Sequence, residues 1–294
     1  MDQFKNEIVN GNIKSLARCI SLIENEKDGY EIFLKSLPQS ATPVIGITGP
    51  PGAGKSTLTD CLIGLIVENK KKVAVLCIDP SSPFNSGALL GDRIRMNEWY
   101  NSPNVFIRSL ATKGSLGGLH PKIIEITDIL KIAPFDFIIV ETVGVGQSEI
   151  EIAGLADVTM LVLVPESGDD IQSMKAGIME IADIFVVNKS DRPGADQFIN
   201  NLTMMLSPAF RHSDNKPGII KTVASQKQGI AELFILINEK IAAHQTSDRK
   251  YFLLAEKAYQ IIQHRKMKGI SKQKIFEEMK KRNITNIYEF VSNY

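Results

Sequence analysis

The sequence predicts an α/β protein with an open, doubly wound and mostly parallel sheet, and with helices added before and after it. Two observations predict this fold. First, seven apolar runs recur along the 294 residues, and most are continuous rather than alternating, as in parallel strands covered on both faces. Second, a glycine-rich turn joins the first run to a helical segment, where sheets of this class bind ligands. The expected strands are 44–48, 72–79, 104–110, 135–141, 158–164, 184–188 and 219–223.

The chain before the first strand has a helical pattern. Residues 2–37 carry apolar side chains at helical spacing, with breaks expected at Gly11 and Gly29 and a stop at Pro38. We therefore expect an N-terminal helical segment over residues 1–40. The apolar positions are Ile13, Leu16, Ile20 and Ile23.

The sheet domain is expected over 41–245 and a helical extension over 246–294. The extension contains two amphipathic patterns, the second starting after a capping serine, Ser271. From Arg249 to Tyr294 there are 11 Lys/Arg against 4 Asp/Glu, a net charge of +7. Such helices pack on the sheet domain or form a dimer arm, and their charge suits solvated faces or an acidic partner.

The composition excludes several classes of protein. The net charge of +1 gives no field that would favour nucleic acid or an anionic membrane. Three scattered cysteines form neither a disulfide framework nor a zinc-binding pattern. No apolar run approaches the length of a membrane span, and the first residues lack a secretory signal pattern. We expect a cytoplasmic protein.

A phosphate-binding loop follows the first expected strand. Residues 49–56, GPPGAGKS, match G-x-x-x-x-G-K-[ST] between a strand and a helix. Its backbone N–H groups would surround phosphate oxygens at the positive end of the helix dipole. Lys55 would bridge the β- and γ-phosphates, and the Ser56 hydroxyl would coordinate Mg²⁺. The expected nucleotide contacts here are Gly49, Gly52, Ala53, Gly54, Lys55, Ser56 and Thr57.

Acidic residues at or after the ends of expected strands are candidate ligands for a Mg²⁺ ion beside the phosphates. Glu141 ends an apolar strand and begins E-x-x-G, whose Gly144 N–H could sense the γ-phosphate. Asp79 ends the second strand, and Asp92 precedes an expected helix, where a capping role is nearly as good an explanation. With Ser56, these are the hard oxygen ligands that Mg²⁺ prefers.

A second motif indicates the base. Asn188-Lys189-Ser190-Asp191 follows the sixth strand, and a carboxylate there can accept from N1–H and N2–H₂ of guanine. Adenine would leave that carboxylate unsatisfied, and sites built on polar pairing discriminate strongly. We therefore expect a guanine nucleotide, GTP or GDP. Ala224 and Ser225, after the seventh strand, are expected to contact the base through the backbone.

The residue after the E-x-x-G glycine is Val145, which cannot orient water as glutamine does in many signalling GTPases. We expect slow intrinsic hydrolysis that a partner accelerates. Polar candidates lie nearby in Gln147 and in residues 167–177, which otherwise suit an ordinary exposed helix start. Within that stretch Asp169, Gln172 and Lys175 would share a helix face, and Gln172 and Lys175 join Lys55 and Glu141 as candidate catalytic residues.

Together these motifs resemble those of one family, the GTPase chaperones of adenosylcobalamin-dependent acyl-CoA mutases (MeaB/ArgK type). The resemblance runs from about Gly11 to Lys240, and it rests on the motifs and the spacing between them. The motifs are GITGPPGAGKST (46–57), CIDPSSPFNSGALLGDRIRM (77–96), VETVGVGQSE (140–149) and SGDDIQSMKAGIMEIADIFVVNKSD (167–191).

The resemblance implies a GTPase of the phosphate-loop class that associates with a mutase of the methylmalonyl-CoA type. Such proteins gate cobalamin loading and protect or reactivate the mutase. It implies that Asp79, Asp92 and Glu141 are magnesium-side switch residues. It also implies that 166–177 is a switch loop through which the mutase influences hydrolysis, and that the chain is a homodimer through its C-terminal helices.

Three other readings stay open at this point. One is a nickel-inserting metallochaperone GTPase, although the four histidines and three cysteines show no metal-binding cluster in the sequence. Another is a kinase or transport-associated ATPase, which Asp191 argues against. The third is a binding module that holds its nucleotide without hydrolysis.

Overall fold

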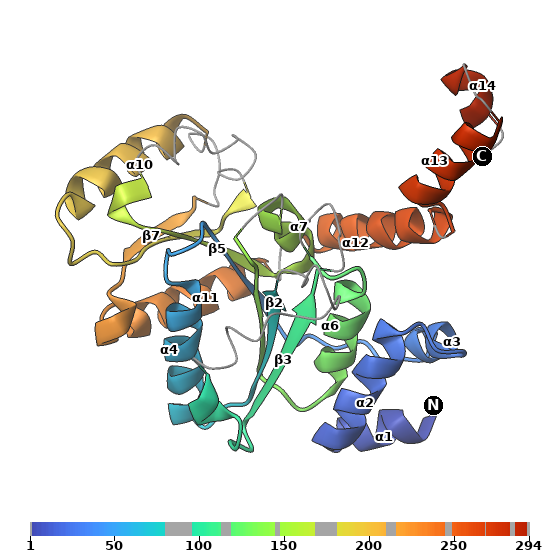
Figure 1. Cartoon of the computed structure of the whole chain (residues 1–294). Helices are drawn as coiled ribbons and strands as arrows, with labels where there is room; N and C mark the ends of the chain where they lie inside the picture. Colours follow the sequence, from blue (N-terminus) through green and yellow to red (C-terminus); the bar gives the residue numbers. More distant parts are fainter. Residues whose placement is uncertain are drawn as a thin grey trace. The chain divides into compact units, whose positions relative to one another are not determined.

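The computed structural model describes residues 2–79, 96–112, 119–144, 148–167, 181–209, 216–244, 249–267, 269–282 and 286–292. The chain divides into two compact units, Met1–Lys250 and Tyr251–Tyr294. The first contains the sheet and the N-terminal helices, and the second consists of helices (Figure 1).

The sheet has seven strands, all paired in parallel, in the order β3-β2-β4-β1-β5-β6-β7. This confirms the predicted fold class, and each expected strand overlaps an observed one. The strands could be predicted because five of them are buried along their whole length, so their sequences are continuously apolar. The strands are β1 (Val44–Thr48), β2 (Val73–Asp79), β3 (Val105–Ala111), β4 (Phe137–Glu141), β5 (Val158–Leu163), β6 (Ile184–Val187) and β7 (Gly218–Lys221).

Helices cover both faces of this sheet, as the doubly wound class requires. Ile45 and Ile47 of β1 share a buried cluster with side chains of the helices on the first face. Gly46 points the other way, where an added Cβ would lie 2.6 Å from Ile152. The first face carries α4 (Lys55–Glu68) and α11 (Ile230–His244); the second carries α6 (Ile123–Ile132), α7 (Ser148–Leu155) and α10 (Ala195–Ala209).

The N-terminal segment forms three helices, with glycines in left-handed conformation at the two expected breaks. Gly11 has φ +83° and Gly29 has φ +84°. The second helix packs against α6. The helices are α1 (Asp2–Val9), α2 (Ile13–Glu24) and α3 (Tyr30–Lys35).

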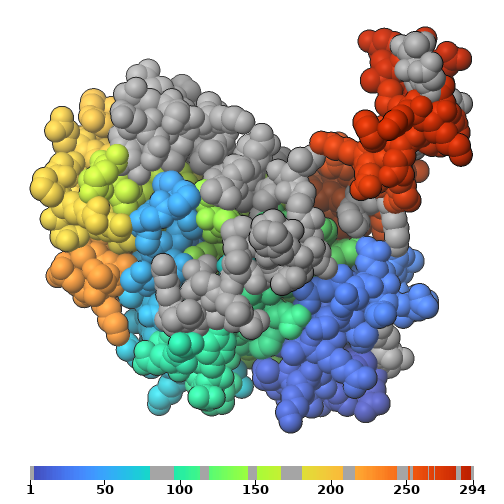
Figure 2. Space-filling view, in the orientation of Figure 1, coloured from blue at the N-terminus to red at the C-terminus, as the bar shows by residue number. Residues whose placement is uncertain are grey.

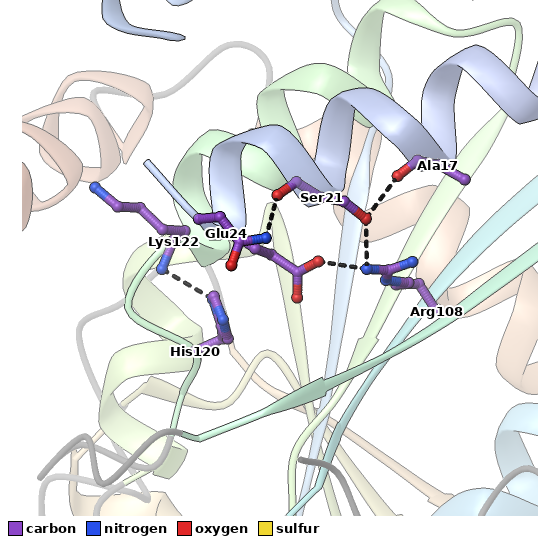
Figure 3. Close-up of polar contacts among 7 residues, drawn as sticks. Ala17, Ser21, Glu24, Arg108, His120 and Lys122 are labelled. Carbon is purple, nitrogen blue, oxygen red and sulfur yellow. Dashed lines mark hydrogen bonds and ion pairs between the residues drawn. The ribbon is translucent and has the colours of Figure 1, made fainter. Parts of the chain in front are cut away.

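Arg108 of the edge strand β3 anchors α2 to the sheet (Figure 3). Its guanidinium pairs with the Glu24 carboxylate and donates to the Ser21 hydroxyl at 3.2 Å. The Ser21 hydroxyl also lies 3.2 Å from the Ala17 carbonyl. No sequence motif indicated a role for Arg108, and in the structure its side chain connects the N-terminal helical segment to the sheet.

A second anchor lies at the start of α6. The buried Lys122 ammonium contacts Glu26 at 2.9 Å, Glu125 at 3.2 Å and the Tyr30 hydroxyl at 3.3 Å. Burial alone lowers the pKa of Lys122, but these partners outweigh it and hold the pKa above its usual value. The Lys122 backbone N–H donates to Nδ1 of His120 (Figure 3).

The second unit holds most of α12 (Arg249–Lys266), together with α13 (Lys272–Arg282) and α14 (Ile287–Val291). Ser271 accepts the Lys274 N–H at 3.1 Å, which confirms the expected cap of α13. The short α14 is capped by Asn286, whose side chain accepts from N–H groups of the first turn, and the sequence pattern did not predict this helix. Among the described helices, none has both the length and the apolar character needed to cross a membrane.

Candidate functional site

The phosphate-binding loop connects β1 to α4 at the carboxyl edge of the sheet. Pro51 and Gly52 are exposed, and this part of the chain reaches the surface in Figure 2. Lys55 begins α4 and is 7% exposed; its Nζ donates to the carbonyls of Gly49 at 2.8 Å and Pro50 at 3.1 Å. The loop therefore folds around the lysine that the motif requires.

The carboxylate of Glu141 lies against the first turns of α4. Ser56 donates to its Oε1 at 2.6 Å, and the Thr59 hydroxyl lies 2.8 Å from its Oε2. All three side chains are buried. A strand-end acid and the serine of the phosphate loop, far apart in sequence, are thus in direct contact.

Asp79 lies at the end of the strand next to β4. Cys77 is level with Glu141 in the β2–β4 register, so Asp79 extends the same edge two residues further. Its side chain is buried, and its carbonyl accepts the Thr112 N–H at 3.1 Å. Asp79 and Glu141 therefore lie at the carboxyl ends of neighbouring strands, where sheets of this class bind ligands.

Gly144 brings the chain after β4 back against the phosphate loop. It has φ +83°, and an added Cβ would lie 2.3 Å from the Gly49 carbonyl oxygen and 2.5 Å from Lys55 Nζ. Only glycine fits this approach. The E-x-x-G segment and the phosphate loop therefore contact each other through backbone and the Lys55 ammonium.

The N-K-x-D motif also contacts the phosphate loop. Asn188 donates to the Ala53 carbonyl at 2.9 Å, and its Oδ1 accepts from Thr222 and from the Ala224 N–H, both at 3.1 Å. Lys189 Nζ donates to the Gly52 carbonyl at 2.7 Å. Asn188 is 2% exposed, so it joins the phosphate loop to the chain after β7 as a buried hub.

The remaining base-side residues lie on the same edge. Lys189 adopts φ +55°, an uncommon conformation for a non-glycine residue, and it directs the turn that carries the exposed Asp191. Ala224 begins the 3₁₀ helix η3 (Ala224–Gln226); its N–H is directed at Asn188, and Ser225 is exposed. The carbonyl of Ala224 accepts from the Cys61 thiol of α4 at 3.1 Å.

Several expected site residues lie outside the part of the chain that the structure describes. They are Asp92, Val145, Gln147, Asp169, Gln172 and Lys175. Residues 113–118, which follow β3, also lie outside it.

Sequence reasoning missed two features of this edge. One is Thr59; its place one turn after Ser56 on the same helix face could have suggested it. The other is an ion pair of 2.6 Å between Glu166, in the 3₁₀ helix η2 (Pro165–Ser167), and Arg192. The Arg192 guanidinium lowers the pKa of Glu166. No local pattern could have indicated a contact between two loops that follow different strands.

The fold and this edge define a phosphate-loop GTPase. The model of the family described as methylmalonyl-CoA mutase-associated GTPase MeaB matches residues 16–283, so the chain belongs to that family. It is a GTPase family, and its members bind GTP and GDP.

Known relatives agree with this assignment, and a solved structure agrees with the fold. A Pyrococcus abyssi protein that bears a GTPase name is 47% identical over 244 residues, covering 81% of this chain and 75% of its own. The mouse methylmalonic aciduria type A homolog is 32% identical over 262 residues, covering 81% of this chain and 62% of its own. The crystal structure of an LAO/AO transport system kinase, at 23% identity, shares the fold with a TM-score of 0.71 over 99% of this chain and 97% of its own.

Proposed function

We propose that this GTPase associates with an adenosylcobalamin-dependent acyl-CoA mutase of the methylmalonyl-CoA type. In this proposal it gates cofactor loading and protects or reactivates the mutase, and GTP binding and hydrolysis are its switch. The single observation that carries the proposal is the family match over residues 16–283, because the family is named for its association with that mutase. The name of the mouse relative supports it, since it refers to a disorder of methylmalonate.

The contacts at the carboxyl edge support the roles proposed for individual residues. Lys55 would leave its two loop carbonyls for the β- and γ-phosphates, and Gly144 lies beside its Nζ to meet the γ-phosphate. Asn188 and Lys189 contact the phosphate loop, and the exposed Asp191 would accept from N1–H and N2–H₂ of a guanine. The proposed catalytic roles of Gln172 and Lys175 rest on the sequence.

The donor set also fits Mg²⁺. A serine hydroxyl has one proton and two lone pairs, so Ser56 can donate to Glu141 and still offer an oxygen to the cation. Asp79 adds a second buried carboxylate from the neighbouring strand. All of these are oxygen ligands, as Mg²⁺ requires, and the phosphates supply others. When bound, Mg²⁺ neutralises the charge that develops on the phosphates.

The proposal is tested by GTP turnover of the purified chain, alone and with the mutase of its host in excess. We expect slow turnover that rises several-fold on mixing. The Lys55→Ala variant is the control, and it should show neither basal nor stimulated turnover because it lacks the phosphate-binding ammonium. Flat turnover with no co-elution in any nucleotide state would remove the mutase as partner and leave the GTPase assignment intact.

Guanine recognition has a separate test. The Asp191→Asn variant should lose GTP affinity and gain affinity for xanthosine triphosphate, whose 2-oxo group accepts from an amide. Sites built on polar pairing discriminate by roughly 10⁴-fold or more in suitable cases. Wild-type GTP affinity in the variant would contradict the role of Asp191.

Two other functions have distinct signatures. A nickel-inserting GTPase would bind Ni²⁺ tightly as a purified protein; in the ranges that the structure describes, no group of three or more His, Cys, Asp and Glu side chains could hold a metal ion. A kinase would transfer label from γ-³²P-ATP to a substrate. We propose in addition that the protein is cytoplasmic and that it is a homodimer; sedimentation at several concentrations would test the dimer, and cell fractionation the location.

A further inference from the structure

We propose that Thr59 is a positioning residue for the metal-side carboxylate of Glu141. The proposal rests on the proposed magnesium site and adds to it a residue that the phosphate-loop motif does not contain. The motif ends at Ser56, and Thr59 lies one helical turn further along α4.

The side chains of Ser56, Thr59 and Glu141 form a hydrogen-bonded group of two hydroxyls and one carboxylate. Ser56 and Thr59 lie three residues apart, on one face of α4, and Glu141 reaches between them from β4. Each carboxylate oxygen receives one hydroxyl: Ser56 at 2.6 Å from Oε1 and Thr59 at 2.8 Å from Oε2. The carboxylate thereby has both its position and its rotation fixed.

The hydroxyl proton of Thr59 is donated to the carboxylate of Glu141. A threonine hydroxyl has one proton, and two acceptors are in reach: Oε2 of Glu141 at 2.8 Å and the Lys55 carbonyl at 3.0 Å. An ionised carboxylate is the stronger acceptor of the two. If the proton turned to Lys55, a hydroxyl lone pair would face the carboxylate at 2.8 Å and repel it.

This bond matters because the acid is glutamate rather than the shorter aspartate. Glutamate has one more rotatable bond, and its terminal carboxylate rotates in a broad well unless its oxygens are held. Thr59 is fully buried, so water does not compete with its hydroxyl for the carboxylate. By holding Oε2, Thr59 keeps Oε1 beside Ser56, the hydroxyl that would bind the cation.

The structure offers a matched control in Thr127. That threonine is also fully buried in a helix, and its hydroxyl donates at 2.7 Å to the Ile123 carbonyl one turn earlier. It is on α6, and it has no part in the nucleotide edge described above. Replacing it by valine removes a buried hydroxyl without touching Glu141.

The experiment measures the Mg²⁺ concentration that half-maximally slows release of a fluorescent GDP, and separately the GDP affinity in EDTA. Thr59→Val should raise the half-saturating Mg²⁺ concentration about tenfold, the usual cost of losing a group that orients a metal ligand. Thr59→Ser should stay within about twofold of wild type, because it keeps the hydroxyl. Thr127→Val should leave the value unchanged, and all four proteins should bind GDP equally in EDTA.

Two results would overturn the role of Thr59. One is a wild-type Mg²⁺ requirement in Thr59→Val; the other is an equal loss of GDP affinity with and without Mg²⁺, which would indicate disturbed packing alone. If Thr59→Val does not fold, Thr59→Ala against Thr59→Ser makes the same comparison. If GDP release from the wild-type protein does not depend on Mg²⁺, the proposed magnesium site itself is refuted before any variant is made, and this inference with it.

Discussion

Ser56 and Glu141 are 85 positions apart in the sequence, and yet the Ser56 hydroxyl donates to Glu141 Oε1 at 2.6 Å. The contact exists because β4 pairs directly with β1, the strand that leads into the phosphate loop. It joins the loop that would bind phosphate to the segment that would sense it.

Shortening the side chain of Glu141 should prevent its carboxylate from keeping both of its hydroxyl contacts. Glu141→Asp removes one methylene, so the carboxylate cannot stay within hydrogen-bond distance of both Ser56 and Thr59. We expect the rate of GTP hydrolysis at limiting Mg²⁺ to fall by about tenfold or more, with partial recovery at high Mg²⁺. Turnover measured across a Mg²⁺ series checks this, and an unchanged series would contradict it.

A side chain at residue 144 should push E-x-x-G away from the phosphate loop. In Gly144→Ala the new methyl would overlap the Gly49 carbonyl oxygen at 2.3 Å and Lys55 Nζ at 2.5 Å. We expect GTP turnover to fall by roughly 10²-fold, since a misplacement of about 1 Å can cost that much. Gly194→Ala is the control, because it has a similar φ of +85° but open space around it. It should cost only about 1 kcal/mol of stability and leave turnover unchanged.

Removing the buried ammonium at the start of α6 should destabilise the protein. Lys122→Met leaves the buried Glu125 without this cation, and Glu26 also loses it, so we expect a loss of about 3 kcal/mol in the free energy of unfolding. Lys221→Met is the comparison, since it breaks an exposed pair with Asp196 and should cost less than about 1 kcal/mol. Urea unfolding of the three proteins measures both values, and equal losses would show that burial does not decide the cost.

The thiol of Cys19 should make stability fall at high pH. Burial raises the pKa of Cys19 to about 11 from 9.0, so the unfolded chain releases this proton first. The thiol is protonated in both states below pH 9, and between pH 9 and 11 ionisation favours the unfolded chain. Across that window the free energy of unfolding should fall more steeply for wild type than for Cys19→Ala. Parallel pH profiles would refute this.

Much of the fold was predictable because its signals are local. The strand VIGIT is continuously apolar in the sequence, and β1 has those same bounds and is fully buried. Gly11 and Gly29 marked helix breaks because the chain there needs a positive φ. α14 was missed because its few residues carry too little pattern for detection.

The site was predictable as a set of strand ends but not as a set of contacts. Motif spacing places Ser56, Glu141 and Asn188 at one edge of a parallel sheet, which follows from chain direction alone. That Asn188 donates to Ala53, or that Glu166 pairs with Arg192, depends on which strands are neighbours. Strand order is a property of the whole sheet, so no local pattern contains it.

The strand order also decides when this protein can acquire its nucleotide site during synthesis. β1 has β4 and β5 as its neighbours, with Val44 opposite Ile138 and Ile45 opposite Val158. The phosphate loop therefore leaves the ribosome long before β4 or β5, the strands that pair with β1, has been synthesised. The guanine side comes later still, because Asn188 is held by Thr222 and Ala224. By the linkage of binding to folding, GTP would stabilise the nascent chain only once the strands that flank β1 and the chain after β7 have been synthesised.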